Sequence, residues 1–163
     1  MKKKNYPFNH PIPKIYIGID PGKSGGLCVI EDEFVKAFPC PESIQDMALL
    51  FAMAISVNET KTTVAYIEKV WARPHDGRGS IWKFAQNYGT WLGIAGAYEI
   101  DLQTVSPQMW MKYFETPKLD KPKRKRYLRD RARAMYPNLK KVTLKTADAI
   151  LIATYAKETD NNS

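Results

Sequence analysis

The chain of 163 residues (18.6 kDa) is long enough for one domain with a sizeable core and short for two. Hydrophobic residues make up 44% and charged residues 26%, a composition that excludes wholesale disorder and fibrous architectures. The formal net charge is +8, and the excess lies in residues 118–141, where eleven basic residues accompany two acidic ones. This indicates a polyanionic partner such as nucleic acid, with a solvated basic helix as the alternative.

Patterns of apolar and turn-forming residues predict the elements in chain order. Residues 1–13 contain three lysines and three prolines, so we expect a flexible basic arm before a single domain over 14–163. β-Branched or aromatic runs between turn residues predict strands, and apolar residues at helical spacing predict helices. The expected order is strands at 14–20, 26–30 and 33–38, a helix near 44–55, a strand at 63–70, a helix near 80–99, a strand at 102–105, a short helix opening at Ser106 and Pro107, a basic helix within 118–141 and a final helix near 144–157. Three hairpin-linked strands before alternating helices and strands predict an α/β fold with a mixed five-stranded sheet flanked by helices.

Two absences in the sequence narrow the class of protein. No apolar stretch reaches the roughly 20 residues needed to cross a bilayer, and the N-terminus lacks the apolar core of a signal peptide, so we expect a cytoplasmic protein with no membrane contact. Cys28 and Cys40 have neither the count of a disulfide framework nor the spacing of a zinc site. We expect both thiols to be reduced packing residues.

Three acidic residues are candidates for a catalytic or metal-binding site. Asp20 ends the first strand, Glu68 lies near the end of the strand at 63–70, and Asp148 belongs to a final helix that is apolar nearly all round. A buried carboxylate needs a partner or a metal, and three such groups suit Mg²⁺, which prefers oxygen ligands. The alternatives are a turn cap for Asp20, a pairing of Glu68 with Lys69 or Arg73, and a structural ion pair for Asp148.

Three motifs in order carry a family resemblance. IGIDPGKSGG (17–26), YIEKVWA (66–72) and TADAILIA (146–153) resemble the RuvC family of Holliday junction resolvases, especially its phage-encoded branch, over about residues 14–157. The resemblance implies an RNase H-like fold, a homodimer, and Mg²⁺-dependent cutting of two strands of a four-way DNA junction, with Mn²⁺ able to substitute. If this protein is encoded by a phage, its expected location is the host cytoplasm.

The resemblance also assigns roles to individual residues. Asp20 and Glu68 would hold the metal ions, together with Asp148 from the last helix. Trp71 falls where the family places an aromatic residue that works against bases at the junction, with a loop residue over the core as the alternative. The sequence departs from the family at Lys145, where a fourth acid or a histidine is usual. Lys145 would share a helix face with Asp148 at i and i+3. As a catalytic residue it would neutralise the scissile phosphate or assist the leaving oxygen; the alternative is that it simply pairs with Asp148.

The turn after Asp20 contains Gly22, Lys23 and Ser24, which invites comparison with a nucleotide-binding P-loop. That motif needs a glycine at position 17, which is Ile17, so the P-loop interpretation is rejected. Within the resolvase interpretation, Lys23 and Ser24 either lie near a DNA phosphate or only shape the turn.

Two further segments are expected to contact DNA. The loop 72–80 follows Glu68 closely, and a loop beside a rigid site often carries recognition. Its candidate DNA contacts are Arg73, His75 and Arg78. The alternative is a plain surface loop. The segment 118–141 has a narrow apolar stripe, so most of its helix surface is free for phosphates. Its candidate phosphate contacts are Lys121, Lys123, Arg124, Lys125, Arg126 and Arg129.

The helix near 80–99 is aromatic and carries glycines at 89, 93 and 96. These glycines suit close packing against a second copy of the helix, although ordinary core packing explains the pattern nearly as well. For function we expect a metal-dependent junction-resolving endonuclease. The alternatives are a RuvC-like nuclease for other branched DNA and a catalytically inactive junction-binding module.

Overall fold

The computed structural model of the protein describes residues 13–55, 61–69 and 77–160. Its elements in chain order are β1 (Lys14–Asp20), β2 (Gly26–Glu31), β3 (Phe34–Pro39), α1 (Ile44–Ala54), β4 (Thr62–Glu68), α2 (Arg78–Ala97), β5 (Leu102–Val105), α3 (Pro107–Tyr113), α4 (Lys121–Met135) and α5 (Ala147–Asp160). The expected order of elements is confirmed. The described helices include none with the length and hydropathy to span a membrane.

The five strands form one mixed sheet in the order β3-β2-β1-β4-β5. Strand β1 pairs antiparallel with β2 and parallel with β4, and β4 pairs parallel with β5. Because β1, β4 and β5 run in the same direction, their carboxyl ends meet at one edge of the sheet. This edge brings the end of β1, at Asp20, close to the end of β4, at Glu68.

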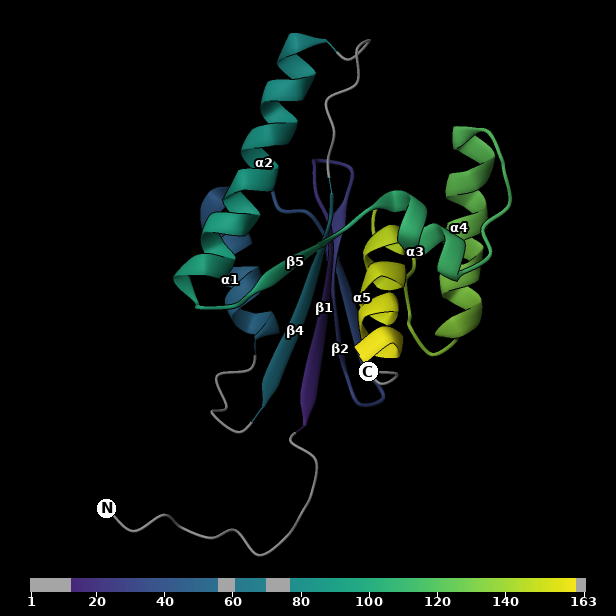
Figure 1. The fold of residues 1–163 in the computed structure, drawn as a ribbon, viewed down its shortest axis with the longest axis horizontal. Helices are drawn as coiled ribbons and strands as arrows, with labels where there is room; N and C mark the ends of the chain where they lie inside the picture. The colour runs from purple at the N-terminus through teal and green to yellow at the C-terminus, as the bar shows by residue number, and fades with distance from the viewer. Residues whose placement is uncertain (1–12, 56–60, 70–76, 161–163) are drawn as a thin grey trace, which may run out of the picture.

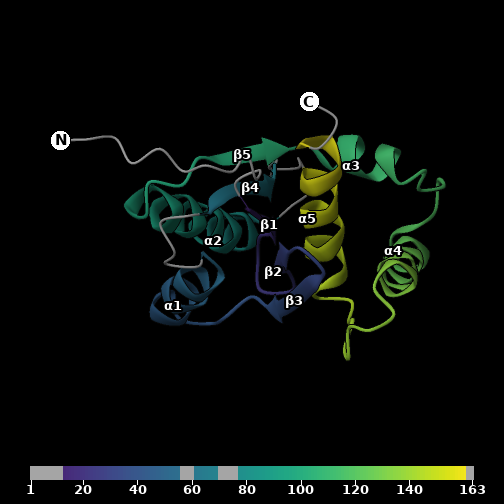
Figure 2. The same cartoon turned by 90° about the horizontal axis from the view of Figure 1, so that it is seen from below.

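Helices cover both faces of the sheet, with α1 and α2 on one face and α3, α4 and α5 on the other (Figures 1 and 2). Alternation along β1 sends Ile15, Ile17 and Ile19 into the core shared with α1 and α2, and sends Tyr16 into the core around α5. Asp20 lies four residues after Tyr16, so the alternation places both on the same face of the strand. Its side chain therefore lies on the α5 side of the sheet.

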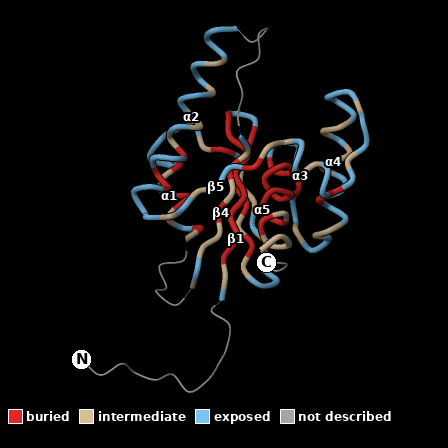
Figure 3. The backbone as a smooth tube through the Cα atoms, in the orientation of Figure 1, coloured by how far each residue is buried: buried red, intermediate tan, exposed pale blue. Residues whose placement is uncertain are grey.

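Helix α5 packs directly on β1 and is buried along most of its length (Figure 3). Gly18 makes the close packing possible, because a Cβ there would lie 2.2 Å from the Ala153 backbone nitrogen and 2.4 Å from the Ala149 carbonyl oxygen. The predicted burial of this helix is confirmed. A carboxylate at its start, Asp148, is consequently held against the sheet edge.

Some predicted boundaries move by a few residues. The last helix begins at Ala147, because residues 144–146 form a turn in which Thr143 accepts the Ala147 N–H at 3.0 Å and the Thr146 hydroxyl accepts the Thr143 N–H at 3.0 Å. This side-chain and backbone pairing satisfies N–H groups at the helix start. Cys28 and Cys40 are free and buried, as expected.

Candidate functional site

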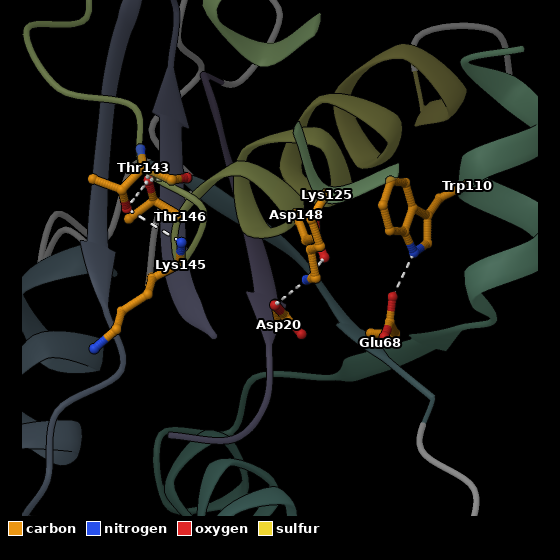
Figure 4. Close-up of polar contacts among 8 residues, drawn as sticks. All are labelled: Asp20, Glu68, Trp110, Lys125, Thr143, Lys145, Thr146 and Asp148. Carbon is orange, nitrogen blue, oxygen red and sulfur yellow. Dashed lines mark hydrogen bonds and ion pairs between the residues drawn. The ribbon is translucent and has the colours of Figure 1, made fainter. Parts of the chain in front are cut away.

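Three carboxylates gather at the carboxyl edge of the sheet. Asp20 is the last residue of β1, Glu68 is the last residue of β4, and Asp148 lies in the first turn of α5. Asp20 is 8% exposed and Asp148 is 5% exposed, and Figure 4 shows the three side chains on one side of the sheet edge. The fold therefore brings together the three acids that are 48 and 80 residues apart in the sequence.

Burial and neighbouring charges perturb two of these carboxylates. Burial raises the pKa of Asp20 well above its usual range, and the negative charges of Asp148 and Glu68 raise it further. Burial also raises the pKa of Glu68 to about 6, while a hydrogen bond from Trp110 acts in the opposite direction. Such a concentration of negative charge is costly unless a cation accompanies it.

Lys125 of α4 supplies a positive charge to this site. Its ammonium donates a hydrogen bond to Oδ2 of Asp148 and lies 3.9 Å from Oδ2 of Asp20 (Figure 4). Burial by itself would lower the pKa of Lys125, but the neighbouring carboxylates, Asp148 first, outweigh burial and raise it. Lys125 is therefore protonated among the three acids, whereas the sequence predicted only a phosphate contact for it.

Trp110 is the second residue that sequence reasoning missed. Its indole N–H donates a hydrogen bond to Oε2 of Glu68 at 2.8 Å. The bond follows from local structure: Val105 pairs with Glu68 across β5 and β4, Ser106 caps α3, and Trp110 comes one turn later. The sequence does contain a pattern that indicates this contact: a helix start at Ser106 and Pro107 directly follows a strand, and Trp110 comes one helical turn later.

The donor set fits a hard divalent cation in its chemistry. All three side chains offer carboxylate oxygens, and Oδ1 of Asp148 is buried with no hydrogen-bond partner among the residues that the structure describes. Across the described ranges, however, no three acidic, histidine or cysteine side chains close around a single point as metal ligands would. In this arrangement it is the Lys125 ammonium that pairs with Asp148 and lies within 3.9 Å of Asp20.

The prediction that Lys145 shares a helix face with Asp148 is wrong. Lys145 lies in the turn before α5, is exposed, and points away from the carboxylates (Figure 4). The pairing hypothesis is wrong too, because within the described part of the chain the ion-pair partner of Asp148 is Lys125. Helix α5 does not extend back through the turn at 144–146, so the i and i+3 spacing does not place Lys145 and Asp148 on one helix face.

The turn after β1 is held against α2. Gly22 has a φ of +106°, which favours glycine, and its N–H donates a 2.7 Å hydrogen bond to Oδ1 of Asn87. Gly25 packs so close that a Cβ would lie 2.0 Å from the Asp20 carbonyl oxygen. Lys23 and Ser24 are both exposed on this turn, next to the acidic site.

The basic helix α4 has two different sides. Leu128 and Ala132 are buried, and Lys125 points into the acidic site. The remaining candidate phosphate contacts are exposed or half-buried: Lys121, Lys123, Arg124, Arg126 and Arg129. Arg78, the first residue of α2, is exposed, and the other candidates of the loop, Trp71, Arg73 and His75, lie outside the described residues.

Helix α2 buries only one side. Trp91, Ile94 and Ala95 enter the core, whereas Trp82 is 67% exposed and Leu92 is 38% exposed. Added Cβ atoms at Gly89, Gly93 and Gly96 would meet nothing within 4 Å, so these glycines do not serve close packing inside the described chain.

Comparison with solved structures identifies the fold. Residues covering 92% of this chain match 96% of "T. thermophilus RuvC in complex with Holliday junction substrate", with a TM-score of 0.63 and 15% identity. A second match, "Thermus thermophilus RuvC structure", has a TM-score of 0.56 and 18% identity over 89% of this chain and 96% of that one. No protein-family model matches the sequence, and a search of curated proteins by sequence finds no match. The resemblance predicted from the three motifs is therefore confirmed at the level of the fold, and the phage branch stays a prediction.

Proposed function

We propose that this chain, which has the RuvC fold, is a structure-selective endonuclease that resolves four-way DNA junctions by Mg²⁺-dependent hydrolysis of phosphodiester bonds, with Mn²⁺ able to substitute. The observation that carries the proposal is the convergence of Asp20, Glu68 and Asp148 at one sheet edge, where a single ammonium, that of Lys125, pairs with Asp148 and lies 3.9 Å from Asp20. Such enzymes serve DNA recombination and repair.

In this proposal the three carboxylates would hold the divalent cation. When bound, the cation supplies Lewis acidity, activates water and neutralises charge at the phosphate. The residues of the chain perform the other tasks. The ammonium of Lys125 stays protonated and adds positive charge beside an incoming phosphate, and the Asp148 oxygen that lacks a hydrogen bond remains available as a ligand.

DNA binding falls to the surfaces around this site. The exposed basic residues of α4 would contact phosphates without reading sequence, and Lys23 and Ser24 would contact a phosphate next to Asp20. The loop after β4 would place Trp71 against a base, with Arg73, His75 and Arg78 as further contacts. These assignments rest on position in the chain and on charge.

Cutting two strands requires two sites, so we propose a homodimer. The open side of α2, with exposed Trp82 and Leu92 and three glycines that no residue of the described chain covers, is the surface that suits a second copy.

The decisive experiment is incubation with a synthetic four-way junction and Mg²⁺, with nicks mapped on all four strands. We expect paired nicks on two strands of like polarity and none on a linear duplex of the same sequence. Asp20→Asn should abolish cleavage and retain binding, whereas the matched control Asp101→Asn, an exposed acid just before β5, should cleave normally. Paired nicking by Asp20→Asn would overturn the proposed site.

Two observations favour a second function, a junction-binding module without catalysis. Lys125 already pairs with Asp148 and Asp20, and Lys145 occupies the sequence position at which the family usually has a ligand. Wild-type protein that binds junctions but is inert with every divalent metal would support the module. A nuclease for other branched DNA is distinguished by comparing four-way, three-way and flapped substrates.

A further inference from the structure

Glu68 differs from the other two acids in how it is held. Asp20 and Asp148 share the Lys125 ammonium, whereas Glu68 receives its hydrogen bond from an uncharged donor, the indole of Trp110. Trp110 is 1% exposed and packs in the core on the α5 side, so its ring has little freedom to turn away.

The structure around Trp110 fixes the indole relative to Glu68 by a short path. Glu68 and Val105 are register partners at the ends of β4 and β5, and the Lys69 N–H donates a 2.7 Å hydrogen bond to the Val105 carbonyl. Ser106 accepts the Met109 N–H, and Trp110 follows in the first turn of α3. Helix α3 therefore starts at the strand pair that carries Glu68, and its Trp110 indole points back toward the Glu68 carboxylate.

The chemistry of this bond leaves part of Glu68 available. An indole has a single N–H donor and no acceptor, so Trp110 engages Oε2 alone. Among the described residues it is the one side chain that donates a hydrogen bond to this carboxylate. A hydrogen bond to one carboxylate oxygen restrains the rotation of the group and leaves the lone pairs of the other oxygen unused by this donor.

We propose that Trp110 is a positioning residue that holds the Glu68 carboxylate in the orientation required to bind the divalent cation. This inference rests on the proposed function, since it needs a cation site at Asp20, Glu68 and Asp148. It assigns to α3 a role in metal affinity beyond packing. Partners of metal ligands typically change metal affinity about tenfold to a hundredfold when removed.

The test compares two conservative variants of buried tryptophans. Trp110→Phe removes the N–H and keeps most of the ring, and Trp91→Phe makes the same change in the core on the opposite face of the sheet. Mn²⁺ binding is measured by the loss of the free-ion electron paramagnetic resonance signal, without DNA. We expect at least about tenfold weaker binding for Trp110→Phe and wild-type binding for Trp91→Phe. Equal binding by the two variants would overturn the inference while leaving the proposed function intact.

A second measurement on the wild-type protein covers the case in which Trp110→Phe does not fold. The chain has four tryptophans, whose indole N–H signals can be followed by NMR during a Mg²⁺ titration. We expect the Trp110 signal to shift at the concentration at which Mg²⁺ binds, and the Trp91 signal to stay in place. Mg²⁺ binding that leaves the Trp110 signal unmoved would overturn the positioning role alone. A wild-type protein that binds neither Mn²⁺ nor Mg²⁺ would overturn the positioning role together with the metal site.

Discussion

At the residue scale, the site is a balance between one ammonium and three carboxylates, of which Asp20 and Asp148 are buried and Glu68 is half-buried. Burial disfavours the charged forms of Asp20 and Glu68, and repulsion from neighbouring carboxylates adds to that cost at Asp20. Lys125 offsets both effects, because a cation among several anions is stabilised even when partly buried. The arrangement explains why one lysine of a strongly basic helix turns inward while its neighbours remain outside.

The role of Lys125 can be measured by its removal. Lys125→Met keeps the length of the side chain and leaves the acids without their counter-charge, so we expect the free energy of unfolding in EDTA to fall by about 1–3 kcal/mol. Adding Mg²⁺ should reduce the difference in the free energy of unfolding between wild type and Lys125→Met, because Mg²⁺ binds the acids of the folded state. The control Lys123→Met removes an exposed ammonium that lies 3.2 Å from Asp120, and it should cost less than about 0.5 kcal/mol. Equal effects of both variants in urea unfolding would contradict this account.

The raised pKa of Glu68 predicts a dependence of stability on pH. Burial raises this pKa from 4.5 to about 6 in the folded protein, so the stabilising effect of protonation is complete below pH 4.5 and is lost as the pH rises through about 6. Without metal, this one group should lower the free energy of unfolding by about 2 kcal/mol between acidic and neutral pH.

Glu68→Gln should remove that part of the pH dependence, because the amide does not titrate and its oxygen can still accept the Trp110 hydrogen bond. Urea unfolding in EDTA at several pH values measures the effect, with Glu115→Gln as an exposed control. If wild type and Glu68→Gln give parallel profiles, Glu68 is not the titrating group.

At the element scale, α4 contributes both to the acidic site and to the surface that we propose binds DNA. It packs on the rest of the chain through Leu128 and Ala132, and it directs Lys125 inward. Most of its other basic side chains face solvent, and Figure 3 shows α4 exposed along much of its length. A helix with this distribution contributes little to the core and much to binding a polyanion.

Binding through α4 should depend steeply on salt. We expect junction affinity to fall at least about tenfold between about 50 and 200 mM salt, because phosphate contacts release counterions. Replacing the exposed Lys121, Lys123 and Arg126 with glutamine should reduce the slope of log affinity against log salt by about two to three. Lys36→Gln, on exposed β3, serves as the control and should keep the wild-type slope. A flat salt response of the wild type would remove α4 from DNA binding.

At the scale of the whole molecule, the proposed activity requires a second copy. One chain has one acidic site, and its helix α2 leaves exposed Trp82 and Leu92 on the side away from the core. Two-fold pairing through such a surface places two equivalent sites on one junction. The other exposed apolar residues on this face of the sheet include Met53 of α1, which offers a comparison site.

Sedimentation at micromolar concentration tests the pairing. We expect wild-type protein to sediment as a dimer, Leu92→Glu as a monomer, and Met53→Glu as a dimer, because only the first substitution buries a charge in the proposed interface. Leu92→Glu should also accumulate singly nicked junctions. A wild-type monomer in the presence of junction DNA would count against paired incision.

Local patterns in the sequence determined most of the architecture. Alternation in residues 14–20 predicted β1, the all-round apolar pattern near 150 predicted a buried helix, and three motifs in order predicted the RuvC fold. The three acids were also identifiable, because a carboxylate at a strand end or in an apolar helix stands out against its neighbours. These properties depend on residues close together in the chain.

Only the tertiary structure decided which basic and aromatic residues join those acids. Lys125 and Trp110 come from helices whose own patterns indicate a DNA-binding surface and a short connecting turn, and nothing in their local spacing marks them as partners of Asp148 and Glu68. The spacing favoured Lys145 as a neighbour of Asp148. Its side chain points away from the carboxylates, because α5 begins only at Ala147, two residues after Lys145. Contacts between distant segments depend on how sheet and helices pack, and that packing is set by the summed burial of many side chains rather than by the residues that meet at the site.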